Sequence, residues 1–310
     1  MKRLQYYFSL CLMTLAILSC NENEVNPDNE QKEPLSSAAK LEAVNKQNLS
    51  VLANAVQSAS VTVSDESSLR SAIRNASPGD IIRVNGTIRL TQTLELANSG
   101  TSSNKINFTG GVLDCSLIPS GWGVKVNGSY WNISYMTIKN APDCGLVFQH
   151  GGYNWVYEVI THGNQDSGIQ IYNDSHHNSI NYCTSYDNYD VANGGENADG
   201  FACKLSAGPG NQFDHCWAEH NSDDGWDLYG QPYSVSITNC TAKNNGYGSN
   251  GDGNGFKLGS AGQNVPHTVT NCTSGNNLAA GYDGNGNTGH INTTGSGGYG
   301  NGKGLWVRIY

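Results

Sequence analysis

One lysine and four aspartates between residues 197 and 257 are of types that could bind a divalent cation and move a proton. They are Asp199, Asp223, Asp224, Asp227 and Lys257. Carboxylate oxygens are the ligands that Ca²⁺ prefers, and several of them in an irregular arrangement suit Ca²⁺ better than Mg²⁺. A lysine can act as a general base if its pKa falls, and a nearby cation lowers it. These residues are far apart in the chain, so the chemistry depends on a fold that brings them together.

A repeat provides such a fold. A unit of the form apolar-x-x-(Cys/Met/Val)-x-(small or apolar)-x-x-Asn recurs, and its starts are 23, 24, 33, 24 and 32 residues apart. The basic period is therefore about 23 to 24 residues, with extra residues in two turns. The copies begin at Ile133, Val156, Ile180, Phe213, Ile237 and Val269. A second short strand follows each unit, at 144–146, 167–169, 199–201, 224–226 and 254–256.

This period predicts an all-β chain that forms a right-handed parallel β-helix of about 23–24 residues per coil. One coil cannot bury its apolar face alone, but stacked coils share one core. Residues 67–76 have helical spacing and precede a strand at Ile81–Val84, so we expect a short N-terminal helix that caps the open end. No further element is recognised in Gly295–Tyr310.

Two internal stacks follow from the repeat. Asn at one equivalent position tolerates left-handed backbone and can bond the coils above and below, which predicts an Asn ladder at a turn. Its members are Asn140, Asn164, Asn188, Asn221, Asn245 and Asn277. Another repeat position points inward and predicts a stack of small apolar side chains rather than disulfides or a zinc site. Its members are Cys183, Cys216, Cys240 and Cys272.

The repeat also predicts which chemical residues are neighbours. When the second strands are aligned on their Gly, Asp199 stands beside Asp224 and Asp227 beside Lys257, with Asp223 at the rim. Adjacent coils are roughly 4.8 Å apart. The position of Asp227 and Lys257 alternates with core residues, so it should face solvent. Stacked carboxylates repel unless a cation lies among them, and this predicts a calcium site beside a lysine.

Composition and charge narrow the class of protein. The chain has 38 Gly, only 14% charged residues and a formal net charge of −9. This composition suits a turn-rich solenoid and argues against a nucleic-acid-binding protein. An acidic ligand would be repelled by the overall field, so it would need a local cation to bind.

Residues 1–20 predict a lipoprotein signal peptide: Lys2 and Arg3, a short apolar run, and Cys20 after a small residue. Cys20 would carry lipid, and the alternative is an ordinary cleaved signal peptide. Residues 21–60 are polar and predict a flexible tether, and 61–310 form the β-helix domain. We therefore expect an exported protein, either secreted or an outer-membrane, cell-surface lipoprotein, that touches the membrane only through its lipid.

Three stretches resemble the family 9 polysaccharide lyases. They are Asn-Ala-Asp-Gly-Phe at 197–201, Asp-Asp-Gly-Trp-Asp at 223–227 and Gly-Asn-Gly-Phe-Lys-Leu at 253–258, and the likeness extends loosely over about 65–305. The resemblance implies that the four aspartates bind calcium and that Lys257 takes a proton from a uronate in the pectin backbone, cleaving it by β-elimination. It implies an acidic plant polysaccharide as the partner, polygalacturonate or alternatively rhamnogalacturonan I, and we expect a monomer.

Three readings of other kinds stay open. A β-helix glycoside hydrolase would use two or three carboxylates, and Lys257 would then have no role. A non-catalytic β-helix would bind glycans through Tyr229, Tyr233 and Trp217 and release no product. An epimerase would return the abstracted proton instead of expelling the leaving group.

Overall fold

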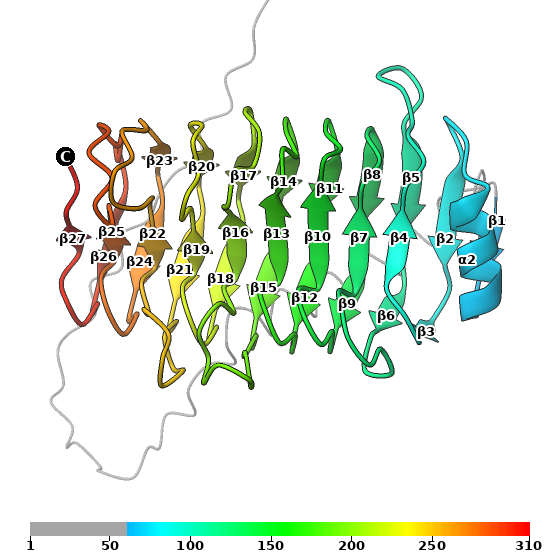
Figure 1. Cartoon of the computed structure of the whole chain (residues 1–310), viewed down its shortest axis with the longest axis horizontal. Coiled ribbons are helices and arrows are strands. Elements are labelled where there is room, and N and C mark those ends of the chain that lie inside the picture. The colour runs from blue at the N-terminus through cyan, green and yellow to red at the C-terminus, as the bar shows by residue number, and fades with distance from the viewer. Residues whose placement is uncertain (1–60) are drawn as a thin grey trace, which may run out of the picture. The chain divides into compact units, whose positions relative to one another are not determined.

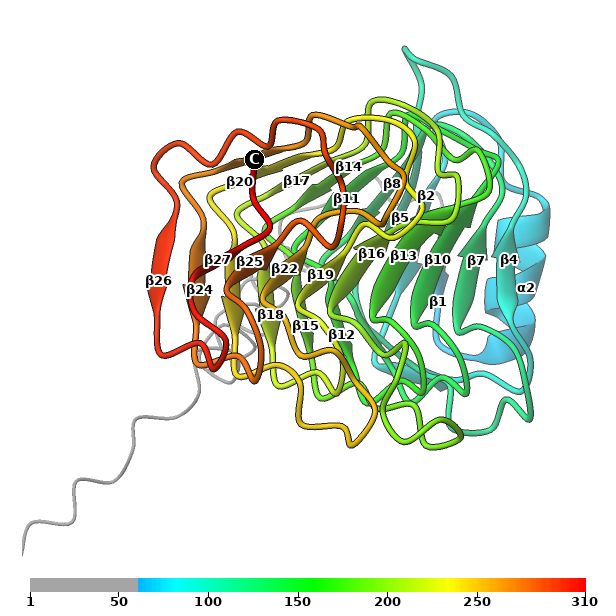
Figure 2. The same cartoon turned by 60° about the vertical axis from the view of Figure 1, so that its left-hand side comes forward.

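The computed structural model describes residues 61–310, which fold into three nine-stranded parallel sheets wound as a β-helix. The lipoprotein signal and the tether predicted for residues 1–60 lie outside the described residues. Figure 1 shows the coils side by side along the solenoid, and Figure 2 shows the three sheets along its sides. Within the described residues, no helix is long and apolar enough to span a membrane.

Each coil contributes one strand to each sheet. Sheet A contains β1 (Val61–Val63), β2 (Ile81–Val84), β5 (Ile106–Thr109), β8 (Trp131–Ser134), β11 (Trp155–Tyr157), β14 (Ser179–Asn181), β17 (Gln212–Asp214), β20 (Ser236–Thr238) and β23 (Thr268–Thr270). Sheet B contains β3 (Thr87–Arg89), β6 (Val112–Asp114), β9 (Thr137–Lys139), β12 (Ile160–His162), β15 (Thr184–Tyr186), β18 (Trp217–Glu219), β21 (Thr241–Lys243), β24 (Thr273–Gly275) and β26 (Gly297–Tyr299). Sheet C contains β4 (Leu94–Leu96), β7 (Val124–Val126), β10 (Leu146–Gln149), β13 (Ile169–Tyr172), β16 (Phe201–Cys203), β19 (Trp226–Asp227), β22 (Phe256–Lys257), β25 (Tyr282–Asp283) and β27 (Trp306–Val307).

The repeat predicted from the sequence is confirmed in its register. All six predicted starts pair with one another in sheet A, from Ile133 through to Val269. The stretch Gly295–Tyr310, in which no element was recognised, contains β26 and β27, which continue sheets B and C. This coil was not recognised in the sequence because its strands are rich in Gly and show little alternation of apolar residues.

The single described helix, α2 (Glu66–Arg74), confirms the predicted cap with shifted ends. It begins at Glu66 because Asp65 is the N-cap, whose carboxylate accepts a hydrogen bond from the backbone N–H of Ser68 at 2.9 Å. Leu69 and Ile73 are buried against the first coils. Figure 1 shows α2 beside β1 and β2 at the N-terminal end of the solenoid.

An aromatic stack lies under the C-terminal half of sheet C. Neighbouring rings are 4.4 to 4.9 Å apart between centroids, in the order Phe201, Trp226, Phe256, Tyr282 and Trp306. Large rings that pack face to face leave little freedom for a strand to slip by one residue, which would turn every side chain to the opposite face. The stack therefore fixes which outward residues of sheet C are neighbours.

The Asn ladder is confirmed for five of the six predicted members and corrected at the sixth. Each side-chain amide donates to the Oδ1 atom of the next coil at 2.8 to 3.0 Å, from Asn164 to Asn277, and Asn301 extends the ladder. Asn140 is exposed, and Ala141 holds the ladder position and donates its N–H to Asn164. Asn140 follows the start of its unit, Ile133, by one residue fewer than the other members follow theirs, so the prediction of Asn140 was wrong by one residue.

The left-handed backbone expected at the ladder lies one residue earlier. The residues with positive φ are Asn140, Gly163, Asp187, His220, Asn244 and Asn276. The ladder amides are thus free to point inward while the preceding residue makes the bend. The four stacked cysteines are buried in the core, as the repeat predicts.

Candidate active site

Two long turns form one wall of a cleft on sheet C. The extra residues of the repeat lie between β15 and β16 and between β21 and β22, with one short coil between them. The long turns meet over that short coil: Asn250 donates its backbone N–H to the carbonyl of Gly194 at 3.2 Å and its side-chain amide to the carbonyl of Asn193 at 2.7 Å. The irregular spacings in the repeat therefore build the side of the cleft.

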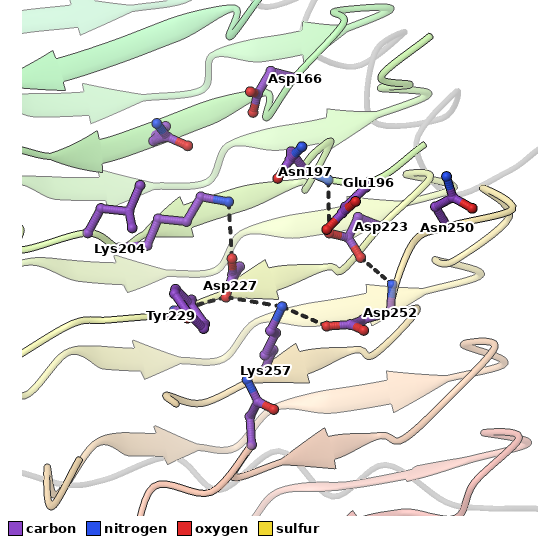
Figure 3. A pocket seen from close by; sticks show the side chains of 13 residues that line it. Asp166, Glu196, Asn197, Lys204, Asp223, Asp227, Tyr229, Asn250, Asp252 and Lys257 are labelled. Carbon is purple, nitrogen blue, oxygen red and sulfur yellow. Dashed lines mark hydrogen bonds and ion pairs between the residues drawn. The ribbon is translucent and has the colours of Figure 1, made fainter. Parts of the chain in front are cut away.

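The predicted neighbours are brought together. Asp224 donates its backbone N–H to Oδ1 of Asp199 at 3.3 Å, and Asp227 pairs with Lys257 in the register of β19 and β22. Asp223 lies in the same cleft and accepts the backbone N–H groups of Asn197 and Asp252. Figure 3 shows Asp223, Asp227 and Lys257 pointing into the cleft.

The expectation that these side chains face solvent is wrong. Asp199 and Asp224 are fully buried, and Asp227 and Lys257 are only 3% and 9% exposed. Asp227 and Lys257 line the cleft, but Lys204 and Lys257 lie against Asp227, and Asp252 of a long turn lies against Lys257. A charged side chain that is buried in this way must be paired or bind a cation.

Three of the four aspartates converge closely enough to hold a metal ion. One carboxylate oxygen each from Asp199, Asp223 and Asp224 lies within 4.8 Å of the others. Oδ2 of Asp224 is buried and has no hydrogen-bond partner, and its nearest cationic atom is Nζ of Lys257 at 3.5 Å. Hard oxygen donors with an unsatisfied, buried carboxylate oxygen fit Ca²⁺. Asp227 lies outside this group of three.

Asp227 is instead bound to a lysine that the sequence analysis missed. Nζ of Lys204 lies 3.0 Å from Oδ2 of Asp227 and 2.8 Å from Oδ2 of Asp199. Lys204 is buried, and Figure 3 shows it reaching Asp227 across the cleft. The signal was the alternation of the strand: Ala202 and Lys204 are two residues apart, so both lie on the side of Asp227.

Lys257 contacts three carboxylates. Its Nζ atom lies 2.7 Å from Oδ2 of Asp252, 3.5 Å from Oδ2 of Asp224 and 3.9 Å from Oδ1 of Asp227. Burial lowers the pKa of Lys257. The charges of Asp227 and Asp224 and the hydrogen bond to Asp252 raise the pKa by more than burial lowers it, so the pKa lies above its usual range. With these charges uncompensated, Lys257 holds its proton.

The carboxylates respond to burial and to the two lysines in different ways. Burial raises the pKa of Asp199 and of Asp224 well above the usual range. Burial also raises the pKa of Asp227, but Lys204 and Lys257 lower it more, so its net direction is down. Asp227 is therefore the best stabilised anion of the cleft, while Asp199 and Asp224 are the two that a cation would stabilise most.

The cleft has a volume of about 560 Å³ and two unlike walls. The long turns supply Glu196, Asn197, Asn250 and Asp252 on one side. Tyr229 lies on the other side, and Leu205, which donates its backbone N–H to the carbonyl of Tyr229, also lines the cleft. A cluster of carboxylates that suits a cation, a lysine whose Nζ lies within 4 Å of it and a cleft over both define the class of protein: a parallel β-helix with an acidic, lysine-containing cleft that could hold a cation.

Comparisons with known proteins agree with this class. A family model described as the Pel9A-like, right-handed β-helix region matches residues 50–308. The chain is 35% identical over 266 residues to pectate lyase L of Paenibacillus polymyxa, covering 76% of this chain and 59% of that protein. It is 33% identical to pectate lyase L of Dickeya chrysanthemi, covering 76% and 60%. The chain thus spans about three fifths of these curated relatives.

Solved structures show the same fold. The crystal structure of pectate lyase Pel9A superposes with a TM-score of 0.68 at 32% identity, covering 72% of this chain and 61% of that one. A rhamnogalacturonan lyase superposes with a TM-score of 0.64 at 23% identity, covering 73% and 67%. The chain belongs to the Pel9A-like right-handed β-helix family, so the resemblance to family 9 polysaccharide lyases and the predicted handedness are both confirmed.

Proposed function

We propose that this protein is a calcium-dependent polysaccharide lyase that cleaves the uronate-containing backbone of pectin, polygalacturonate, by β-elimination. The observation that carries the proposal is the position of Nζ of Lys257, 3.5 Å from a buried carboxylate oxygen of Asp224 that has no hydrogen-bond partner. The similarity to pectate lyases supports the reaction, and rhamnogalacturonan I remains the alternative substrate.

Asp199, Asp223 and Asp224 would hold the calcium ion. When bound there, Ca²⁺ would offset the charge of the C6 carboxylate and make the C5 proton of the uronate easier to remove. Asp227 completes the set that we predict from the sequence, and it also anchors Lys204. An acidic substrate would thus bind at a local positive charge within an acidic protein.

Lys257 takes the C5 proton. Its amine is neutral only if the surrounding negative charge is offset, since the carboxylates now hold its pKa above the usual range. Asp227 is already shared, because its Oδ2 binds Lys204 and its Oδ1 accepts the backbone N–H of Tyr229 at 2.9 Å. The electrons of the C5–H bond form the C4=C5 double bond as the C4–O4 bond breaks, and water supplies the proton to O4.

One assay tests this function against the alternatives. The full chain is incubated with polygalacturonate and with rhamnogalacturonan, in calcium or in excess chelator, and the absorbance of unsaturated products and the number of new reducing ends are followed. A lyase raises both signals together in calcium only. New reducing ends without absorbance would indicate a hydrolase, and binding without either signal would indicate a non-catalytic glycan-binding protein or an epimerase.

The substrate also needs a free carboxylate. Fully methyl-esterified pectin offers no anion to the cation, so we expect it to be cleaved more slowly than de-esterified polymer. Equal rates on the two polymers would contradict the proposed role of the metal. An extracellular polymer as substrate is consistent with the export predicted from residues 1–20.

A further inference from the structure

Leu205 and Tyr229 form an exposed apolar ledge on the edge of the cleft. Both side chains are about half exposed, at 49% and 48%, although both line the cleft. They come from adjacent coils, and Leu205 donates its backbone N–H to the carbonyl of Tyr229 at 2.9 Å. Charged and polar residues make up the rest of the lining of the cleft, so two large, exposed apolar side chains at its mouth are unusual.

The backbone at Leu205 supports a selected role for its side chain. Leu205 has a φ of 51°, in the left-handed region that Gly and Asn adopt at a lower conformational energy than Leu. One coil earlier the equivalent residue is Asn173, three residues after Gln170, which pairs with Ala202. Asn173 has a φ of 48° and is the residue type that suits such a turn. A leucine at this position therefore carries a backbone cost that Asn173 does not.

The ledge lies at a defined place relative to the proposed base. Nζ of Lys257 is 5.8 Å from the centroid of the Tyr229 ring. Figure 3 shows Tyr229 on one side of Lys257 and Asp223 and Asp252 on the other. Tyr229 and the aspartates therefore lie on opposite sides of Lys257, so a polymer with one uronate at Lys257 can extend over Tyr229.

We propose that the Leu205–Tyr229 ledge is a sugar-binding subsite that holds the galacturonate next to the cleaved one by the C–H face of its pyranose ring. This rests on the proposed function. The flat tyrosine ring offers apolar area to the ring face, and Leu205 extends that area along the solenoid. The carboxylate of the bound sugar points out of the cleft into solvent, where the charge stays hydrated.

The test compares variants of the full chain on polygalacturonate in saturating calcium. Tyr229→Ala combined with Leu205→Ala should raise KM by about tenfold, about 1.4 kcal/mol, with kcat changed by less than about threefold, because binding is lost equally in ground and transition states. Tyr229→Phe keeps the ring and should keep KM within about twofold. Tyr182→Ala is the matched control, since Tyr182 is similarly exposed, at 43%, but does not line the cleft.

Several results would overturn the subsite. One is an unchanged KM in the double variant, and another is a KM of Tyr229→Phe as high as that of Tyr229→Ala. A third is a change in the oligomeric state of the double variant on gel filtration, which would make the ledge a contact between copies of the protein. Retardation of the same variants in gels containing polygalacturonate measures binding without turnover. A wild-type protein that makes no unsaturated product but is retarded, and loses retardation with Tyr229→Ala, would refute the lyase function and keep the subsite. Retardation that Tyr229→Ala leaves unchanged would refute the subsite whether or not product forms.

Discussion

Replacing Lys204 with methionine should destabilise the protein far more than the same change at Lys257. Met keeps an unbranched stem and removes the charge. Lys204 makes two contacts of 3.0 Å or less with carboxylates that are almost fully buried, those of Asp199 and Asp227. The one short contact of Lys257 is with Asp252, which is 58% exposed on its side chain.

The expected sizes follow from burial. Breaking a buried ion pair by removing one partner costs about 3–5 kcal/mol, which applies to Lys204. An exposed pair contributes less than about 1 kcal/mol, so the contact of Lys257 with Asp252 adds little, and its longer contacts bring the total to about 1–2 kcal/mol. For a domain of this size 1 kcal/mol moves Tm by roughly 2–4 °C, so Lys204→Met should lower Tm by roughly 6–20 °C.

Differential scanning calorimetry of both variants in excess chelator at neutral pH measures the difference. Calcium should recover part of the loss in Lys204→Met, because a cation beside Asp199 would replace the missing charge. A fall in Tm of less than about 3 °C for Lys204→Met, or a fall no larger than that of Lys257→Met, would refute the reasoning that Lys204 holds the buried carboxylates in place.

Three further predictions concern the ladder, a buried histidine and the metal. Asn188→Ala should lower the free energy of unfolding by about 3–5 kcal/mol, because it leaves the buried backbone N–H and side-chain amide of Asn164 without an acceptor. Asn140→Gly should lower it by less than about 1 kcal/mol. Equal losses of the two variants in chemical denaturation would contradict the ladder. Burial lowers the pKa of His267 to about 4, so its contribution to stability is present above about pH 6.5 and is lost as pH falls toward 4; a His267→Asn variant whose Tm falls over this range as steeply as that of the wild type would exclude this cause. Asp224→Asn should weaken calcium binding by at least about tenfold in titration calorimetry, while exposed Asp174→Asn should not; unchanged affinity in Asp224→Asn would remove Asp224 from the metal site.

The sequence predicts the fold well because the β-helix repeats one local rule. Alternating apolar residues fix which side faces the core, and that side fixes which outward residues of adjacent coils are neighbours. The pairing of Asp227 with Lys257 follows from this rule and is confirmed. The error at Asn140 arose because the ladder was followed by residue type: Ala141 is eight residues after Ile133, as Asn164 is after Val156, so position alone gives the correct residue.

The surroundings of the site are less predictable. Lys204 could have been found from the alternation of its strand, but its two partners come from different coils. Asp252 lies in a long turn that follows no repeat, and contacts of that turn with Asp223 and with the other long turn bring it to Lys257. The burial of Asp227 and Lys257 was missed for a similar reason, since the sequence places side chains on a face but does not reveal which side chains of other coils and turns lie against them.

The rate of unsaturated-product formation by Lys257→Ala, in saturating calcium on polygalacturonate, tests the central claim most directly. If Lys257 takes the C5 proton, the rate should fall by at least about a hundredfold, while calcium affinity in titration calorimetry is retained. Lys257→Arg should be nearly as impaired, because a guanidinium stays protonated. A Lys257→Ala protein that keeps more than about a tenth of the wild-type rate, a loss under ~1.4 kcal/mol, would contradict a lysine base.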